Sequence, residues 1–205
     1  MRKEIKIYII AIIIVLISSP LINWVIQNRI NASQNTGIEY IGHHEQQQDF
    51  VRFWTDVQPN SWSGMETTQK WSFTSGLTLT AQVKVTSTGS STFYAEVLIV
   101  DTGDVDEGFG FQITNSTPGQ VRIKGWSWLD VDESFSAYID KPIDVLINLE
   151  AKKTNTGQMD FYVDSALIGS ITTPIPYQEG VINFDLTNGA QGGTAEVQLN
   201  YQVQQ

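Results

Sequence analysis

Hydrophobic and polar residues alternate along most of the chain beyond residue 50, with the period of a β-strand that buries one face. The clearest case is 77–86, where Leu, Leu, Ala, Val and Val alternate with Thr, Thr, Gln, Lys and Thr. The stretch 93–128 predicts three successive strands, separated by the turn sequences Asp101-Thr-Gly103 and Asn115-Ser-Thr-Pro-Gly119. Such a meander has one apolar face, so the flanking sequence must supply a second layer.

Similar patterns on both sides of this meander predict the remaining strands. They cover residues 50–54, 71–73, 77–86, 143–149, 159–163, 167–171, 181–186 and 195–203. No helix of normal length is expected after residue 31. About ten strands joined by short turns predict an all-β fold, an antiparallel β-sandwich of the jelly-roll type.

The N-terminal part has a different pattern. Residues 7–26 carry no charge and are long enough, as one transmembrane helix, to cross a hydrocarbon layer of ~30 Å. The basic residues Arg2, Lys3 and Lys6 precede this run, so we expect a single-pass plasma-membrane protein with a cytoplasmic N-terminus and an extracellular domain. A cleavage site is poorly matched, which favours an uncleaved anchor. The expected organisation is an anchor (1–30), a polar linker (31–49) and a β-sandwich (50–205).

The linker contains the sequence His43-His44-Glu45, which has ligand types suited to a metal. Adjacent side chains of an extended chain point in opposite directions, however. We therefore interpret this stretch as a solvated linker.

Composition narrows the function classes. Twelve basic residues against 22 acidic ones give a net charge of −10, which disfavours binding to nucleic acid because phosphates would be repelled. The absence of cysteine excludes disulfides, zinc-thiolate sites and thiol nucleophiles.

Five segments follow one another in a recognisable order. They are Phe109-Gly-Phe-Gln-Ile113, Val121-Arg-Ile123, Ile143-Asp-Val-Leu-Ile-Asn-Leu149, a hairpin into Phe161-Tyr-Val-Asp164, and a closing strand from Val197 to Val203. This order resembles the concanavalin A-like lectin and glucanase superfamily with its laminin G-like members, over residues 50–205. The resemblance implies a domain that binds or cleaves glycans, often with calcium nearby.

The same resemblance bears on catalysis. Hydrolases of the superfamily that use paired carboxylates carry Glu-x-Asp-x-Glu on one strand, which places both working groups on one face. This chain has no such motif. We therefore expect a non-catalytic module and predict no catalytic residue.

Two loops repeat the tetrad Asp-Val-Asp-Glu, at 104–107 and 130–133. Calcium takes six to eight oxygen ligands, so the two loops together could bind it if they meet at one end of the sandwich. The candidate ligands are Asp104, Asp106, Glu107, Asp130, Asp132 and Glu133. Two alternatives remain: a pair of solvated acidic turns, and a catalytic carboxylate pair for which no general acid can be named.

Trp126 and Trp128 lie two residues apart on a predicted strand, so both indoles should project from one face. If Val121 and Ile123 point inward, the pair lies outward with Arg122 and Lys124, unless Gly125 marks a bulge. Sugar rings stack on exposed indoles, so these four residues form a candidate ligand-binding site. The alternative is that both tryptophans fill the core.

Two further sequence patterns, at Asn31 and Asn115, match the acceptor for N-glycosylation. Together these features predict a membrane-anchored surface module that binds glycan or mediates adhesion. The alternative is an accessory subunit of a surface filament, surface layer or membrane complex, with partner proteins on its surface. A glycoside hydrolase is the third possibility.

Overall fold

A computed structural model describes residues 37–205 except 75, 91, 103–106, 130–131 and 173–177, and only the backbone of 129 and 132. The chain divides into two compact units, Met1–Ile38 and Glu39–Gln205, and the predicted anchor at 7–26 lies outside the described residues. No helix within the described ranges is long and apolar enough to span a membrane.

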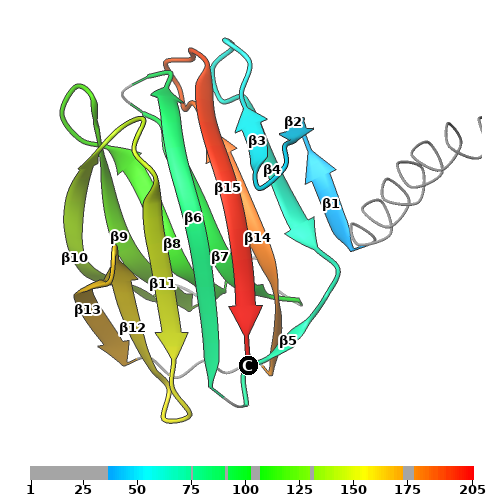
Figure 1. The fold of residues 1–205 in the computed structure, drawn as a ribbon, viewed down its shortest axis with the longest axis vertical. Helices are drawn as coiled ribbons and strands as arrows, with labels where there is room; N and C mark the ends of the chain where they lie inside the picture. Colours follow the sequence, from blue (N-terminus) through cyan, green and yellow to red (C-terminus); the bar gives the residue numbers. More distant parts are fainter. Residues whose placement is uncertain (1–36, 75, 91, 103–106, 130–131, 173–177) are drawn as a thin grey trace, which may run out of the picture. The chain divides into compact units, whose positions relative to one another are not determined.

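The described residues form two antiparallel sheets, as the alternating pattern predicts (Figure 1). The larger sheet has the order β1-β4-β14-β7-β8-β9-β10, and β5 also pairs with β14. Its strands are β1 (Ile38–Ile41), β4 (Trp62–Thr67), β5 (Trp71–Ser72), β7 (Tyr94–Asp101), β8 (Gly108–Asn115), β9 (Gln120–Leu129), β10 (Asp132–Pro142) and β14 (Glu179–Thr187).

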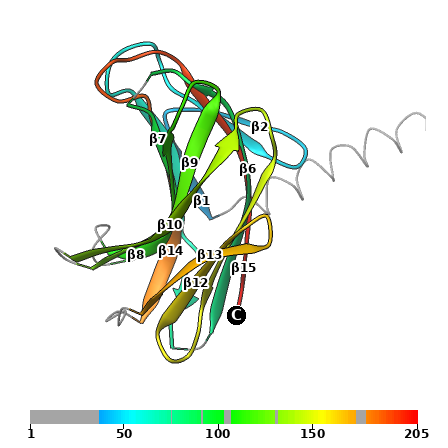
Figure 2. The ribbon, with the colours of Figure 1, turned by 90° about the vertical axis from the view of Figure 1, so that its left-hand side faces the viewer.

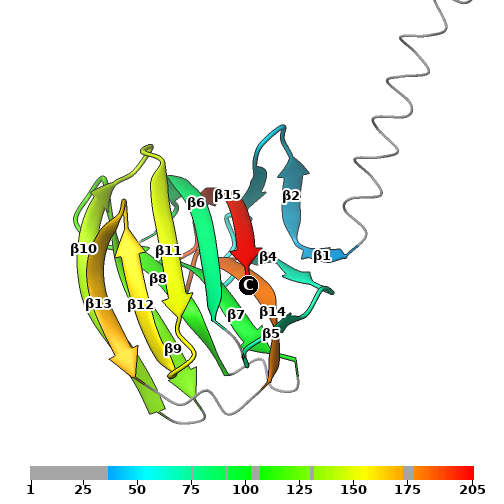
Figure 3. The same cartoon turned by 60° about the horizontal axis from the view of Figure 1, so that its bottom comes forward.

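The smaller sheet has the order β13-β12-β11-β6-β15-β3-β2. Its strands are β2 (His43–Gln46), β3 (Val51–Trp54), β6 (Leu77–Thr88), β11 (Ile147–Lys153), β12 (Gln158–Val163), β13 (Ala166–Thr172) and β15 (Ala195–Gln204). Seen from the side, the two sheets lie face to face as two layers (Figure 2). At one edge β10 lies beside β13, where the Gly169 backbone comes close to Ser136 and no side chain would fit between them (Figure 3).

The core lies between the sheets and consists of the alternate residues that the sequence pattern assigns to it. Val83 and Val85 of β6 are fully buried, and so are Phe111 of β8 and Phe161 of β12. The last two rings meet edge to face across the core, with centroids 5.6 Å apart. This geometry is the favourable one for aromatic pairs.

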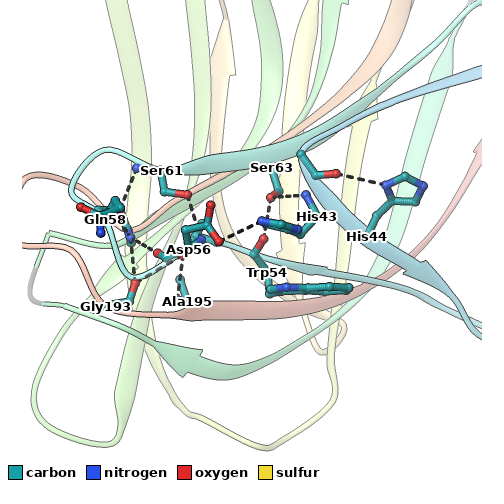
Figure 4. Close-up of polar contacts among 12 residues, drawn as sticks. His43, His44, Trp54, Asp56, Gln58, Ser61, Ser63, Gly193 and Ala195 are labelled. Carbon is teal, nitrogen blue, oxygen red and sulfur yellow. Dashed lines mark hydrogen bonds and ion pairs between the residues drawn. The ribbon is translucent and has the colours of Figure 1, made fainter.

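The structure corrects the predicted linker at 31–49 within its described part, because β1 and β2 form there and pair with the sheets. Figure 4 shows how β2 is attached. The His43 backbone N–H donates to Ser63 Oγ (3.0 Å), which itself donates to the Trp54 carbonyl (2.5 Å). The His43 ring stacks on Trp54 and contacts Asp56 Oδ1 at 2.9 Å. His44 points the other way, as an extended chain requires.

The predicted strand 143–149 begins only at Ile147. Asp144 has a positive φ of 61°, which ends the extended conformation, and its N–H donates to the Val85 carbonyl. Val145, which the pattern places inward with Ile147 and Leu149, is consequently exposed, as is Leu146.

The hairpin between β12 and β13 turns at Asp164 and Ser165, both with positive φ, as a two-residue turn of this kind requires. The Asp164 carboxylate accepts from Lys141 Nζ (2.6 Å) and from the Asn148 backbone N–H (3.0 Å), and these bonds stabilise the strained turn.

Candidate functional site

The two tryptophans of β9 point away from the smaller sheet. Val121 and Ile123 are fully buried in the core, and the pairing of β9 with β8 runs from residue 121 to 128 without a bulge. Gly125 takes the next inward position, where a Cβ would lie only 2.1 Å from Cγ of Phe161. The predicted register is therefore confirmed, and Trp126 and Trp128 lie on the outer face of the larger sheet.

The pair does not, however, form a fully exposed platform. Trp126 is only 5% exposed, because it packs with Leu98, Val100 and Val181 on this outer face. Trp128 is half-buried and stacks on Trp126 with ring centroids 5.4 Å apart.

Two glycines of β8 explain this burial. Gly110 lies between Trp126 and Leu98 in the register, and Gly108 lies between Trp128 and Val100. Because neither glycine has a side chain, the indoles can lie across β8 and reach the apolar residues of β7. The outer face thus has a small apolar cluster of its own.

A polar row runs beside this cluster across the strands. In register order it consists of Asp185 (β14), Glu96 (β7), Gln112 (β8) and Lys124 (β9). Gln112 Nε2 donates to Glu96 Oε1 at 2.7 Å. Asp185 lies directly opposite Glu96, and Glu66 of β4 is close enough to act on it electrostatically.

These carboxylates are only partly solvated. Burial raises the pKa of Glu96, and the charge of Asp185 raises it further, while the hydrogen bond from Gln112 lowers it. Burial also raises the pKa of Asp185, with Glu66 adding to the effect. Burial lowers the pKa of Lys124, against the opposing charges of Glu133 and Glu96. Groups shifted in this way are typical of ligand sites, although structural networks produce such shifts too.

Hollows on this face follow the same residues. One of ≈ 330 Å³ is lined by residues of β1, β4, β7, β9 and β14: Ile41, Trp62, Met65, Glu66, Glu96, Leu98, Val100, Trp126, Trp128, Asn183 and Asp185. We call it the acidic hollow. A hollow of ≈ 550 Å³ continues along Tyr94, Glu96, Gln112 and Trp128, and one of ≈ 390 Å³ lies between Trp62, Tyr94 and Asp185.

Two residues that line the acidic hollow carry a polar side-chain atom with no hydrogen-bond partner in the described part of the chain. The atoms are Nε1 of Trp126, a donor, and Oδ1 of Asn183, an acceptor, and both are buried. Buried polar groups are nearly always paired, so these two are candidates to bind a ligand. Trp62, 49% exposed, adds an aromatic ring to this hollow, and Tyr94, 41% exposed, lines the two neighbouring hollows.

The two predicted cationic residues lie on the side of β9 that faces β10. Arg122 forms an ion pair with Asp140 (3.0 Å) and lies over the Tyr138 ring, 4.3 Å from its centroid. Lys124 Nζ lies 3.6 Å from the centroid of the Phe135 ring. Neither lines the acidic hollow. Their role in ligand binding stays a prediction.

The acidic tetrads are described only in part. Asp104, Asp106 and Asp130 lie outside the described residues, and the Asp132 side chain is not described. Glu107 precedes Gly108, which pairs with Trp128, and Glu133 pairs with Trp128 from the other side. Glu107 and Glu133, the last residues of the two tetrads, therefore lie at the same end of the larger sheet, as a shared site requires. Calcium binding stays a prediction. No group of three or more potential metal ligands occurs among the described residues.

Of the glycosylation candidates, Asn31 lies outside the described residues. Asn115 is the last residue of β8 rather than part of a turn. Its side-chain amide donates to the Ser90 carbonyl. Attachment of a glycan there stays a prediction.

The fold is that of the concanavalin A-like sandwiches. Carbohydrate-binding module CBM66 from Bacillus subtilis superposes with a TM-score of 0.58 at 13% identity, over 82% of this chain and 96% of that one. A legume lectin-like domain from Entamoeba histolytica gives 0.55 at 14% identity, over 82% and 90%. An alginate lyase from Pseudomonas aeruginosa gives 0.58 at 14% identity, over 79% and 85%. No protein-family model and no curated protein matches the sequence.

The buried charge of Glu96 has a measurable effect on stability. The pKa of Glu96 is higher in the folded than in the unfolded protein, so the folded state binds the proton more tightly. As pH rises from the unfolded-state pKa through the folded-state pKa, ionisation of Glu96 therefore lowers the free energy of unfolding. Glu96→Gln should therefore raise the free energy of unfolding by about 1 kcal/mol at pH 7.5. The gain should shrink toward pH 4.5.

Urea unfolding of both proteins at several pH values would measure this difference. Glu45→Gln on exposed β2, whose carboxylate pairs with Arg52 (3.5 Å), is the control for loss of one exposed charge and should not reproduce the gain of Glu96→Gln. A Glu96→Gln variant that is less stable than the parent at pH 7.5 would show that the charged Glu96 carboxylate does not destabilise the fold.

Proposed function

We propose that the domain is a glycan-binding module and that its binding surface is the outer face of the larger sheet. The observation that carries this proposal is the acidic hollow. It combines aromatic rings, carboxylates, and a buried donor and acceptor that lack partners. Sugars present apolar C–H faces, which stack on aromatic rings, and hydroxyls, which suit carboxylates and amides.

The fold supports this proposal by analogy. Two of the similar structures are described as a carbohydrate-binding module and a lectin-like domain, and the third as an alginate lyase. Concave faces lined by aromatic residues and a few polar groups are common binding sites in proteins. We further propose that residues 7–26 hold the domain at the outer surface of the plasma membrane, on the strength of the uncharged run and the basic residues before it.

The proposed module is non-catalytic. An enzyme would use Glu96 and Asp185, which lie opposite each other on neighbouring strands, as its carboxylate pair. The missing Glu-x-Asp-x-Glu motif argues against this. Release of reducing ends from a bound glycan, lost in Glu96→Gln, would replace the binding proposal by a hydrolase.

The direct test is substitution of Trp62, whose ring is half exposed at the rim of the hollow. Trp62→Ala should weaken binding about five- to tenfold, since a stacked ring contributes on the order of 1 kcal/mol, and should leave folding nearly intact. Binding of the full chain would be measured on a glycan array and then by calorimetry.

Tyr162→Ala is the matched control, because Tyr162 lies on β12 of the smaller sheet, outside the hollows of the larger sheet. It should bind like the parent. If no glycan is bound by the parent and Trp62→Ala instead abolishes association with a protein partner, the accessory-subunit alternative replaces the glycan proposal. The exposed rings of Phe135 and Tyr138 on the edge strand β10 would then be the next residues to test.

A further inference from the structure

The charges of the acidic hollow are strongly one-sided. Its lining contains three carboxylates, Glu66, Glu96 and Asp185, and none of its described lining residues is basic. Asp185 has no hydrogen-bond or ion-pair partner among the described residues, and its Oδ1 lies over Gly64, where a side chain would collide with it. The basic residues of this face lie at its β10 side: Arg122 pairs with Asp140, and Lys124 lies above the Phe135 ring, from where its charge also acts on Glu96.

A second, independent observation is that two residues lining this hollow carry polar atoms with unmet hydrogen-bonding capacity. Trp126 is only 5% exposed, and its Nε1 donor has no hydrogen-bond partner among the described residues. Asn183 lies in the same cross-strand row as Trp126, and its Oδ1 acceptor also has no hydrogen-bond partner among the described residues. The lining of the hollow therefore combines three carboxylates, one unpaired donor, one unpaired acceptor and the half-exposed ring of Trp62.

We propose that the acidic hollow binds a sugar carrying a protonated amino group, a 2-amino-2-deoxy sugar of the glucosamine type within a glycan. The ammonium lies among Glu66, Glu96 and Asp185, successive rings of the glycan lie along the outer face from Trp62 toward Trp128, and hydroxyls pair with Trp126 Nε1 and Asn183 Oδ1. This inference rests on the proposed function and specifies its ligand class.

Two other classes of ligand fit less well. A uronate would bring a further negative charge next to three carboxylates, which is unfavourable at close range. A bare metal ion requires ligands that converge on one point, and the described acidic residues contain no such group. An ammonium on a sugar ring is larger and can be shared by carboxylates on three neighbouring strands, β4, β14 and β7.

The test compares three oligosaccharides of equal length with the full chain: a β-1,4-linked glucosamine hexamer, its fully N-acetylated form, and an oligogalacturonate. Calorimetry at pH 6 and 0.15 M salt should show at least tenfold tighter binding of the amine form than of either other ligand. Asp185→Asn and Glu96→Gln should each remove most of this preference. Glu45→Gln, an equal charge change on the smaller sheet, should keep it.

The outcomes separate this inference from the proposed function. If the N-acetylated form or the uronate binds as well as the amine form, and Trp62→Ala weakens that binding, the module binds glycans but the amine specificity is wrong. If Glu45→Gln weakens binding as much as Asp185→Asn, the preference is general attraction to an acidic protein, and the site is wrong. If no glycan of any class binds, both the proposed function and this inference are wrong.

Loss of binding in the Asp185→Asn variant must not reflect unfolding. Burial already raises the pKa of this carboxyl, so a neutral amide of the same shape should be tolerated at least as well as the charged group. Unchanged or increased resistance to urea is the expected control result. The preference should also weaken as pH falls, because Glu96 and Asp185, whose pKa values are raised by burial, then become protonated; Glu66 faces the same hollow.

Discussion

Replacing Trp126 with alanine is expected to lower the free energy of unfolding by about 3–5 kcal/mol, the usual loss for a buried tryptophan. The indole is 5% exposed and packs with Leu98, Val100 and Val181 outside the main core. Alanine would leave a cavity above Gly110, a residue that has no side chain to fill it. Urea denaturation followed by far-UV circular dichroism would measure the loss.

Trp128→Ala provides the comparison, because its ring is only half-buried. Its effect on stability should be clearly smaller, whereas its effect on glycan binding should resemble that of Trp62→Ala. Trp126→Phe should recover part of the lost stability, since it refills most of the cavity and removes the unpartnered Nε1 donor. If Trp126→Ala were as stable as the parent, the indole would be exposed and the apolar cluster on the outer face would not exist.

Gly125→Ala is expected to lower the free energy of unfolding by about 1–3 kcal/mol, although it adds only one methyl group. The added Cβ would lie 2.1 Å from Cγ of Phe161, well inside van der Waals contact. That ring is fully buried and meets Phe111 edge to face, so it has little room to move. Chemical denaturation of the variant and the parent would measure the cost.

A second substitution tests the mechanism. Phe161→Leu shortens the side chain that collides with the new methyl group, so it should cost less in the Gly125→Ala background than in the parent, and a double-mutant cycle would give the coupling. Gly76→Ala is the matched control. An added Cβ there meets its nearest atom at 3.3 Å, and the change should be nearly neutral. Additive effects of the first two changes would mean that Gly125 does not face Phe161.

The strands were largely predictable because alternation is a local property. The pattern of 77–86 corresponds to β6, whose inward residues Val83 and Val85 are fully buried. The alternating pattern gave a wrong prediction at 143–146. Asp144 takes a positive φ there, and its N–H bonds to the Val85 carbonyl, a tertiary contact that the local pattern does not contain. The pattern also missed β1, β2, β4 and β10. The strands β1 and β2 have no fully buried face and form by pairing with the sheets.

The candidate site was predictable only in part. Trp126 and Trp128 could be placed on the outer face, because Val121 and Ile123 mark the inward positions of the same strand. Glu96 and Asp185 carried no comparable signal, as each alternates with core residues like any outward polar residue. The alternation of glycines at 108 and 110 is the one feature that could have indicated the burial of the indoles.

The sequence by itself thus determined the all-β class, the inward and outward sides of the main strands, and an uncharged N-terminal run suited to a membrane. Those properties depend on neighbours one or two residues away. Only the tertiary structure decided that Asp185 lies opposite Glu96, that glycines of β8 lie beneath the indoles, and that Trp126 is buried on an outer face. Strand pairing joins residues far apart in the chain, and the periodicity of one strand does not specify which strand lies beside it.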